Sequence, residues 1–261
     1  MIIDTHTHVW SDDYERYPTP NGRKHSMPGS TEFLLETMAK HNVDHAVLVQ
    51  FIAYWYDNSY IIDTMKQYPG KFAAIGLINW FEPGAPDRLE KLVKEHGFAG
   101  LRFHTYRAPN GPANWLGPQQ RNVWKKAQEL GSSFIIHAKP EHLPIVEPVI
   151  AAFPGVSVTL DHQGGIPRVE DPPHPMLQNL LAYAKYPNVV VKYSVAREKG
   201  REDYPYRDTF PMFRRIYDAF GPQRIMWGSN FPEVFDQTKG YEEVLDIFRK
   251  HLDFLSKNDL E

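Results

Sequence analysis

Two histidines, His6 and His8, lie one residue apart near the start of the chain, in an apolar, β-prone stretch that begins at Ile2. Side chains of a strand alternate between its two faces, so both imidazoles are expected to point the same way. Two imidazoles at the end of a strand can hold a divalent cation or bind the oxyanion of a substrate. The alternative interpretation is a pair of surface histidines close to a terminus.

Further polar side chains occur where later apolar runs end. They are Arg102, His104, His137, Lys139, His162, Asn230 and, depending on register, either Lys192 or Ser194. If these runs are neighbouring parallel strands, their last side chains converge on one small opening. Burying so many polar groups is unfavourable unless something binds them, which favours a functional cluster over isolated structural histidines.

Arg102 has two interpretations of equal weight. A guanidinium binds a carboxylate or an oxyanion through two parallel hydrogen bonds, so Arg102 is predicted to clamp such a group. A structural ion pair inside the protein explains the same residue equally well.

Aromatic side chains on the loops after the apolar runs are candidates to cover a ring or a sugar in a binding site. They are Trp10, Tyr54, Trp55, Tyr106 and Trp115. For any one of them, packing within its own loop is at least as good an interpretation.

Eight short runs rich in apolar and β-branched residues are predicted to be strands. They span Ile2–His6, Ala46–Phe51, Phe72–Ile78, Ala99–Phe103, Phe134–His137, Val156–Asp161, Val189–Tyr193 and Ile225–Gly228. Several are continuously apolar, as over Val189–Val191. Such strands are typically covered on both faces within a parallel sheet.

Longer amphipathic segments alternate with these runs and are predicted to be helices. They span Thr31–His41, Ser59–Gln67, Pro86–His96, Pro118–Leu130, Leu143–Ala152, Met176–Lys185, Asp208–Phe220 and Tyr241–Leu255. Eight strand–helix repeats favour a (β/α)8 TIM barrel over an open doubly wound sheet, and no G-x-G-x-x-G follows the first strand. Such barrels carry their reactive groups at the carboxyl ends of the strands, where the polar residues above lie.

The composition limits the class of protein. The 261 residues, without a linker-like stretch, are predicted to form one barrel domain over residues 1–261. A net charge of -3 gives no support for nucleic acid or an anionic membrane as a partner, and the absence of cysteine excludes disulfides and thiolate chemistry. Because no apolar run approaches the ~20 residues of a membrane span and no signal-peptide pattern is present, we expect a cytoplasmic protein with a small-molecule substrate, either monomeric or oligomeric.

Five sequence segments resemble the amidohydrolase superfamily and extend over nearly the whole chain. They are I-D-T-H-T-H-V-W, G-L-R-F-H, I-I-H-A-K-P, L-D-H-Q-G-G and M-W-G-S-N-F-P. They are most similar to the amidohydrolase-related group that contains pyrone-dicarboxylate lactonase and sugar-acid lactonases. The resemblance implies a (β/α)8 barrel that hydrolyses a C–O or C–N bond, although related branches are decarboxylases or hydratases of aromatic acids.

The resemblance also bears on cofactors. In metal-containing members, the H-x-H pair and later histidines ligate one or two divalent ions, which implies a zinc or manganese ion held by His6, His8, His137 and His162. Pyrone-dicarboxylate lactonase works without a metal, and its histidines contact the substrate directly, so both possibilities stay open. Many two-metal relatives carry a carboxylated lysine on the fourth strand, and its absence here argues against a dinuclear centre.

One position departs from the family pattern. Members generally end strand eight with an aspartate that takes a proton from the attacking water, and the corresponding residue here is Asn230. An amide has no basic site near neutral pH. Among nearby carboxylates, alternation places Asp4 deeper in the barrel and turns Asp161 towards the helices, whereas Glu233 and Asp236 lie on the loop that follows and can swing in.

Three functions fit these residues. The first is a hydrolase of a small lactone or ester, in which His6 and His8 polarise the carbonyl and His137 or His162 replaces the missing aspartate as base. Its catalytic residues are His6, His8, Arg102, His137, His162 and Asn230, and its substrate-binding residues are Arg102, His104, Tyr106 and Trp10. The second is a metal-dependent decarboxylase of an aromatic acid, which needs no water-activating carboxylate. The third is a catalytically altered binding protein.

Overall fold

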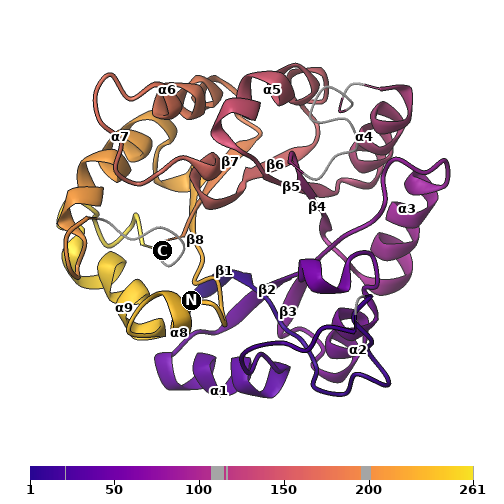
Figure 1. The fold of residues 1–261 in the computed structure, drawn as a ribbon. Helices are drawn as coiled ribbons and strands as arrows, with labels where there is room; N and C mark the ends of the chain where they lie inside the picture. The colour runs from indigo at the N-terminus through magenta and orange to yellow at the C-terminus, as the bar shows by residue number, and fades with distance from the viewer. Residues whose placement is uncertain (21, 107–114, 116, 195–200, 261) are drawn as a thin grey trace.

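The protein is a barrel of eight parallel strands in which each strand pairs with the next along the chain, with helices around the outside (Figure 1). The computed structural model describes residues 1–20, 22–106, 115, 117–194 and 201–260. The strands are β1 (Ile3–Thr7), β2 (His45–Val49), β3 (Phe72–Gly76), β4 (Gly100–His104), β5 (Ser133–His137), β6 (Ser157–Leu160), β7 (Val189–Tyr193) and β8 (Ile225–Trp227). The predicted (β/α)8 barrel is confirmed.

The barrel closes where the segment after β8 meets β1. Thr7 and Phe231 form a parallel bridge, and the backbone N–H of His8 donates to the carbonyl of Phe231 at 2.7 Å. The N–H of Asn230 donates to the carbonyl of His6 at 2.9 Å. The residues that follow β8 are therefore tied by their backbone to the H-x-H pair.

Helices follow the strands around the barrel. They are α1 (Thr31–His41), α2 (Ser59–Gln67), α3 (Ala85–His96), α4 (Pro118–Leu130), α5 (Leu143–Ala152), α6 (Pro175–Leu181), α7 (Phe210–Phe220), α8 (Val234–Gln237) and α9 (Tyr241–Asp246). The Ser30 side chain caps α1 by accepting from the N–H of Phe33, and Gly97 and Gly131 end α3 and α4 in the left-handed conformation that glycine adopts readily. Within the described residues, no helix has the length and apolar character needed to cross a membrane.

A predicted strand and a predicted helix are longer than the observed elements, because the regular hydrogen bonding ends before the apolar pattern does. The predicted strand Phe72–Ile78 is too long because β3 ends at Gly76, after which the N–H of Leu77 donates to the Asn58 side chain. The predicted helix Tyr241–Leu255 is also too long. The α-helix α9 ends at Asp246 and continues as a π-helical turn that closes when the N–H of Leu252 donates to the carbonyl of Ile247.

The main hydrophobic core lies between the strands and the surrounding helices. A small separate cluster of Val49, Ile75 and Ile135 comes from β2, β3 and β5. Ile135 pairs with Thr159 of β6, and Thr159 is buried as well. Side chains two apart on a strand share a face, so this register also decides the direction of Asp161, which follows Thr159 by two residues.

Candidate active site

Five of the polar residues predicted at strand ends come together at the carboxyl end of the barrel, whereas Lys139 is exposed. His6, Arg102, His137, His162 and Lys192 are all buried, although their positions span most of the sequence. The imidazole ring centroids of His6 and His162 are 4.6 Å apart, and those of His137 and His162 are 5.1 Å apart. The structure therefore brings these histidines together in one place, as a buried cluster.

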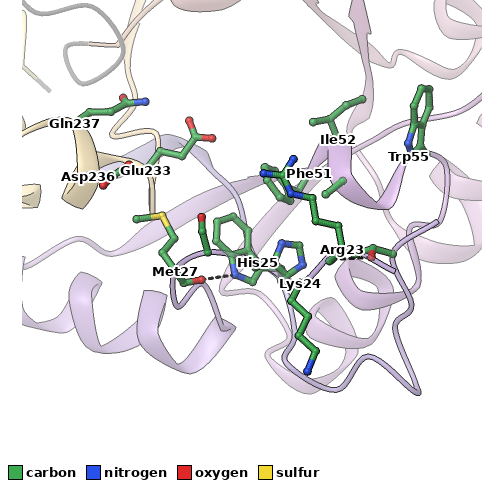
Figure 2. A pocket seen from close by; sticks show the side chains of 14 residues that line it. Arg23, Lys24, His25, Met27, Phe51, Ile52, Trp55, Glu233, Asp236 and Gln237 are labelled. Atoms are coloured by element: carbon green, nitrogen blue, oxygen red, sulfur yellow. Dashed lines mark hydrogen bonds between the residues drawn. The ribbon is translucent and has the colours of Figure 1, made fainter. Parts of the chain in front are cut away.

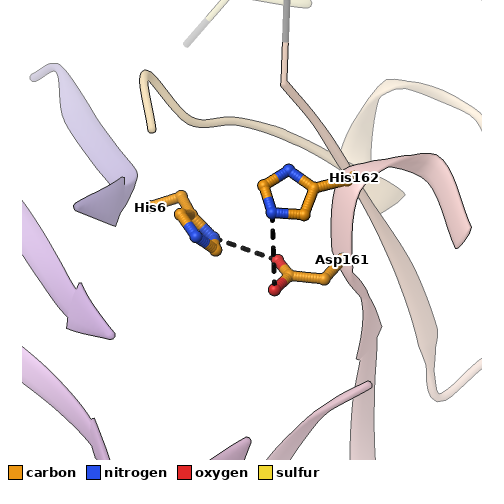
Figure 3. Close-up of side chains that lie close together, drawn as sticks. All are labelled: His6, Asp161 and His162. Atoms are coloured by element: carbon orange, nitrogen blue, oxygen red, sulfur yellow. Dashed lines mark ion pairs between the residues drawn. The ribbon is translucent and has the colours of Figure 1, made fainter. Parts of the chain in front are cut away.

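Asp161 lies at the centre of this cluster, and the expectation that it faces the helices is wrong. Its Oδ1 lies 3.0 Å from His6 Nδ1 and 3.4 Å from Lys192 Nζ, and its Oδ2 lies 2.7 Å from Arg102 Nη2. Figure 3 shows the Asp161 carboxylate facing the rings of His6 and His162. Asp161 follows Thr159 by two residues, so alternation from the buried Thr159 directs it inwards.

The turn after β6 brings His162 inwards as well. The backbone there leaves the extended conformation, with φ values of 49° at His162 and 45° at Gln163. Alternation along a strand would have placed Asp161 and His162 on opposite faces. The left-handed turn at His162 removes that restriction, so both side chains enter the cluster.

Asp161 is the carboxylate around which the charged groups of the cluster gather. Burial by itself raises the pKa of this carboxyl, but its electrostatic interactions with His6 and with the cations Arg102 and Lys192 outweigh burial and hold the pKa well below its usual value. Burial lowers the pKa of Lys192, and the Asp161 carboxylate opposes that shift. Of the two register alternatives for β7, Lys192 is thus the residue that reaches the cluster, and Arg102 forms the structural ion pair that was one of its two interpretations.

The H-x-H pair has an arrangement suited to a cation. His8 Nδ1 lies 2.7 Å from the carbonyl oxygen of Val49, and His6 Nδ1 is closest to the Asp161 carboxylate. The Val49 carbonyl accepts a hydrogen bond, so His8 Nδ1 carries its hydrogen. His6 Nδ1 lies 3.0 Å from the accepting Asp161 carboxylate and 3.3 Å from the donating Lys192 ammonium, and the tautomer that donates to the nearer carboxylate leaves a lone pair on Nε2, as in His8. The two Nε2 atoms lie 3.2 Å apart. Burial lowers the pKa of His6 well below its usual value and that of His8 to about 4, so both rings are neutral near neutral pH and their facing lone pairs fit a shared cation.

Asp161 adds a possible metal ligand that was missing from the predicted set. His6, Asp161 and His162 offer ligand atoms that all lie within 4.8 Å of one another. His137 Nδ1 and His162 Nε2 instead face Arg102 Nη2, at 3.1 and 3.4 Å. The donor set of two imidazoles and a carboxylate suits a divalent ion.

The predicted substrate-binding residues surround this cluster unevenly. Tyr106 is partly exposed, and its hydroxyl lies 3.2 Å from His137 Nδ1. The ring of His104 is 5.2 Å from that of His137. Trp10 is not in the cluster itself: it is buried, with its indole N–H donating to the carbonyl of Met27, and stacks on His25.

Trp10 lines a cleft of about 490 Å³ beside the cluster (Figure 2). Phe51 connects the cleft with the histidine cluster, because it lines the cleft and its ring centroid lies 5.5 Å from that of His8. Trp55 is a further lining residue. Trp115, by contrast, is fully buried against Trp80 in the main core, so of its two interpretations the structure supports packing rather than contact with a substrate.

The carboxylates near the end of β8 differ in accessibility. Asp4 is fully buried and accepts hydrogen bonds from Tyr241 Oη at 2.8 Å, Ser229 N at 2.9 Å and His6 N at 3.1 Å, as its predicted depth implied. Glu233 lines the cleft, and its Oε2 accepts from Asn230 Nδ2 at 2.8 Å. Asp236 lines the same cleft.

An eight-stranded parallel barrel with histidines, a carboxylate and an arginine gathered at its strand ends defines a barrel enzyme with a polar active site. The chain belongs to the amidohydrolase family, whose sequence model matches residues 3–261.

Two similar curated proteins act on lactones according to their names. The 4-sulfomuconolactone hydrolase of Hydrogenophaga intermedia is 26% identical over 252 residues, which cover 92% of this chain and 76% of the relative. The L-fucono-1,5-lactonase of Burkholderia ambifaria is 25% identical over 240 residues, which cover 88% of this chain and 80% of the relative.

Solved structures share the fold. A probable 2-pyrone-4,6-dicarboxylic acid hydrolase from Acinetobacter baumannii, with citric acid bound, has a TM-score of 0.81 and 22% identity, covering 99% of this chain and 94% of that chain. An amidohydrolase from Burkholderia multivorans with bound zinc has a TM-score of 0.79 and 20% identity, with the same coverage of 99% and 94%.

Proposed function

We propose that this protein is a hydrolase that opens a small lactone. The observation that carries the proposal is the convergence of His6, His8, Arg102, His137 and His162 around one buried cluster, next to a cleft large enough for a small ring. Family membership and the lactone hydrolases among the relatives support this reaction over decarboxylation of an aromatic acid.

The residues of the cluster have complementary roles in this reaction. His6 and His8 turn their Nε2 atoms to the same point, where the carbonyl oxygen of the substrate is polarised. Arg102 is anchored by Asp161 and stabilises the negative charge that develops on that oxygen. Tyr106 and His104 contact the substrate from the exposed side, and Trp10 and Phe51 provide apolar surface in the cleft.

A zinc or manganese ion held by His6 and His8, with Asp161 and His162 beside them, fits the facing Nε2 lone pairs. Such an ion would supply Lewis-acid polarisation of the carbonyl. The His6→Ala variant is expected to lose the bound metal, because one of the two facing nitrogens is removed. Metal content per chain, measured by mass spectrometry on purified protein with His104→Ala as control, tests this, and an unchanged stoichiometry would rule out His6 as a ligand.

Turnover decides the reaction. Wild-type protein is assayed for acid release from L-fucono-1,5-lactone, 4-sulfomuconolactone and 2-pyrone-4,6-dicarboxylate, and for carbon dioxide release from hydroxybenzoates. We expect ring opening of at least one lactone and its loss in His6→Ala. Carbon dioxide release without lactone opening would establish the decarboxylase instead, and binding without turnover of either class would establish a binding protein.

A further inference from the structure

We propose that Glu233 is the group that takes the proton from the attacking water, and that Asn230 is the positioning residue that orients the Glu233 carboxylate. The inference rests on the proposed lactone hydrolysis and names the base for that reaction. It departs from the expectation that a histidine of the cluster, His137 or His162, performs this step.

The backbone holds Glu233 beside the H-x-H pair. The N–H of Asn230 donates to the carbonyl of His6, and the carbonyl of Phe231 accepts from the N–H of His8. Glu233 follows two residues later at the start of the α8 turn, and its carboxylate lines the cleft opposite Phe51 (Figure 2). The negative charge of Glu233 also acts on His8. Burial, which is the larger effect, and the charge of Arg102 lower the pKa of His8, and the charge of Glu233 raises it.

The other described carboxylates near the cluster are poorly placed to accept a proton. Asp161 contacts Arg102, Lys192 and His6. Among the described contacts of the cluster, its carboxylate is the only negative partner of the buried cations Arg102 and Lys192, so protonation of Asp161 would leave both without one. Asp4 is fully buried beneath the cluster and holds three hydrogen-bond donors. Neither one lines the cleft. Glu233 and Asp236 both do, but Asp236 is exposed to solvent, whereas Glu233 is half-buried and is held by Asn230.

The histidine nitrogens whose contacts are described are engaged as well. His137 Nδ1 and His162 Nε2 face the guanidinium of Arg102, which is always protonated, so these lone pairs point at a donor rather than at water. The Nδ1 of His8 is turned to the carbonyl of Val49. A half-buried carboxylate at the wall of the cleft has the better access to a water molecule.

The asparagine at position 230 is explained by the same contact. Its Nδ2 donates to Glu233 Oε2 at 2.8 Å, and Asn230 is almost fully buried in a left-handed conformation with φ of 63° that asparagine tolerates. An aspartate here would bring two carboxylates to hydrogen-bond distance, where one must bind a proton. The amide therefore places no second carboxylate beside Glu233 and fixes one of its oxygens.

The step balances without a further reagent. Glu233 accepts a proton from water while the water oxygen bonds to the lactone carbonyl carbon and the carbonyl electron pair moves to oxygen. The tetrahedral intermediate re-forms its carbonyl, the ring C–O bond breaks, and the protonated Glu233 returns the proton to the leaving oxygen. The products are a ring-opened hydroxy acid and the original Glu233 carboxylate.

The test uses the lactone that wild-type protein opens fastest. Glu233→Gln keeps an oxygen for Asn230 but removes the base, and we expect kcat to fall by about 10²- to 10⁴-fold with KM changed less than about threefold. Glu242→Gln is the matched control, since Glu242 is exposed in the first turn of α9 outside the cleft, and we expect its kcat to equal that of wild type. A Glu233→Gln protein with wild-type kcat overturns the proposal.

Asn230 variants separate positioning from a structural role. Asn230→Ala should lower kcat with little change in KM, and adding it to Glu233→Gln should cause no further loss, because its effect passes through Glu233. Asn230→Asp should lower kcat as well, since it places a second carboxylate beside Glu233. A gain in lactone hydrolysis in Asn230→Asp, or additive losses in the double variant, would overturn the assignment.

A reaction that needs a base but no lactone keeps this inference separate from the proposed function. With 5-nitrobenzisoxazole, a base takes the ring C–H proton, the N–O bond breaks, and a yellow cyanophenolate forms. We expect wild-type protein to accelerate this elimination and Glu233→Gln to lose the acceleration. If the two proteins accelerate the elimination equally, or if neither exceeds the rate in buffer alone, Glu233 is overturned as the base. Absence of lactone turnover overturns only the proposed function.

Discussion

At the scale of single residues, the site depends on a buried carboxylate surrounded by cations. Asp161 contacts His6, Arg102 and Lys192, and these contacts hold its pKa well below the usual value against the effect of burial. A buried charge is tolerated only when it is paired and hydrogen-bonded. The orientation of Arg102 towards His137 and His162 therefore depends on Asp161.

The Asp161→Asn variant tests this dependence. It leaves Arg102 and Lys192 buried without their carboxylate, so we expect the free energy of unfolding in urea to fall by about 3–5 kcal/mol. Asp171→Asn removes a carboxylate from an exposed pair with Arg201, whose side chains are 79% and 64% exposed, and should change stability by less than about 1 kcal/mol. Equal stabilities of the two variants would contradict the role assigned to Asp161.

At the scale of elements, neighbouring strands approach each other closely at Gly100 of β4. This residue pairs with Ser133 of β5, and a Cβ at position 100 would lie 1.7 Å from the carbonyl oxygen of Ser133. Any side chain larger than hydrogen would separate the two strands. The register that places Arg102 and His137 on adjacent strands therefore requires glycine at this position.

Gly100→Ala is expected to lower the unfolding free energy by more than about 3 kcal/mol, because the clash is with backbone and no side chain can move away. Gly84→Ala is the control: its Cβ would meet nothing nearer than 3.9 Å, and its φ of -82° suits alanine. Thermal unfolding of both variants measures the difference. A Gly100→Ala protein as stable as Gly84→Ala would show that the strands adjust.

The loops after β1 and β2 are joined by Tyr54, whose hydroxyl accepts from the N–H of Ser11 at 3.0 Å. Burial raises the pKa of Tyr54 to about 12. The folded state thus holds this proton more tightly than the unfolded state, where the pKa is about 10. The corresponding stability is present below about pH 10 and is lost as the pH rises through about 12.

Tyr54→Phe removes this ionisation. The difference in unfolding free energy between wild type and Tyr54→Phe should therefore shrink by about 2 kcal/mol between about pH 9 and pH 11.5. Urea unfolding at the two pH values measures it. Parallel stability changes in the two proteins would mean that the Tyr54 hydroxyl is accessible to water.

At the scale of the whole molecule, one sheet of eight strands and one main core connect distant parts of the chain. We expect a single cooperative unfolding transition, with the calorimetric enthalpy equal to the van't Hoff enthalpy. The reason is that the barrel closes through the contact between β1 and the segment after β8, which joins the two ends of the sheet. Differential scanning calorimetry tests this. Two separated transitions would contradict the prediction that residues 1–261 form one domain.

Much of this architecture follows from local sequence patterns. Helices α1, α2, α4 and α5 have the predicted bounds, because amphipathic periodicity, caps and helix-ending glycines act within a few residues. The positions of His6, His8, His137 and His162 at strand ends were predictable for the same reason. Once eight strand–helix repeats specify a barrel, strand ends must meet at one face.

Which side chains face one another was decided only by the tertiary structure. The inward direction of Asp161, the entry of Lys192 into the cluster and the contact between Asn230 and Glu233 depend on register and on the turns after β6 and β8. Those features are set by pairing between strands far apart in sequence, and a one-residue change of phase reverses the face on which a side chain lies. Local patterns therefore determined the barrel and its histidines, whereas long-range packing determined the charge balance around them and the carboxylate available to water.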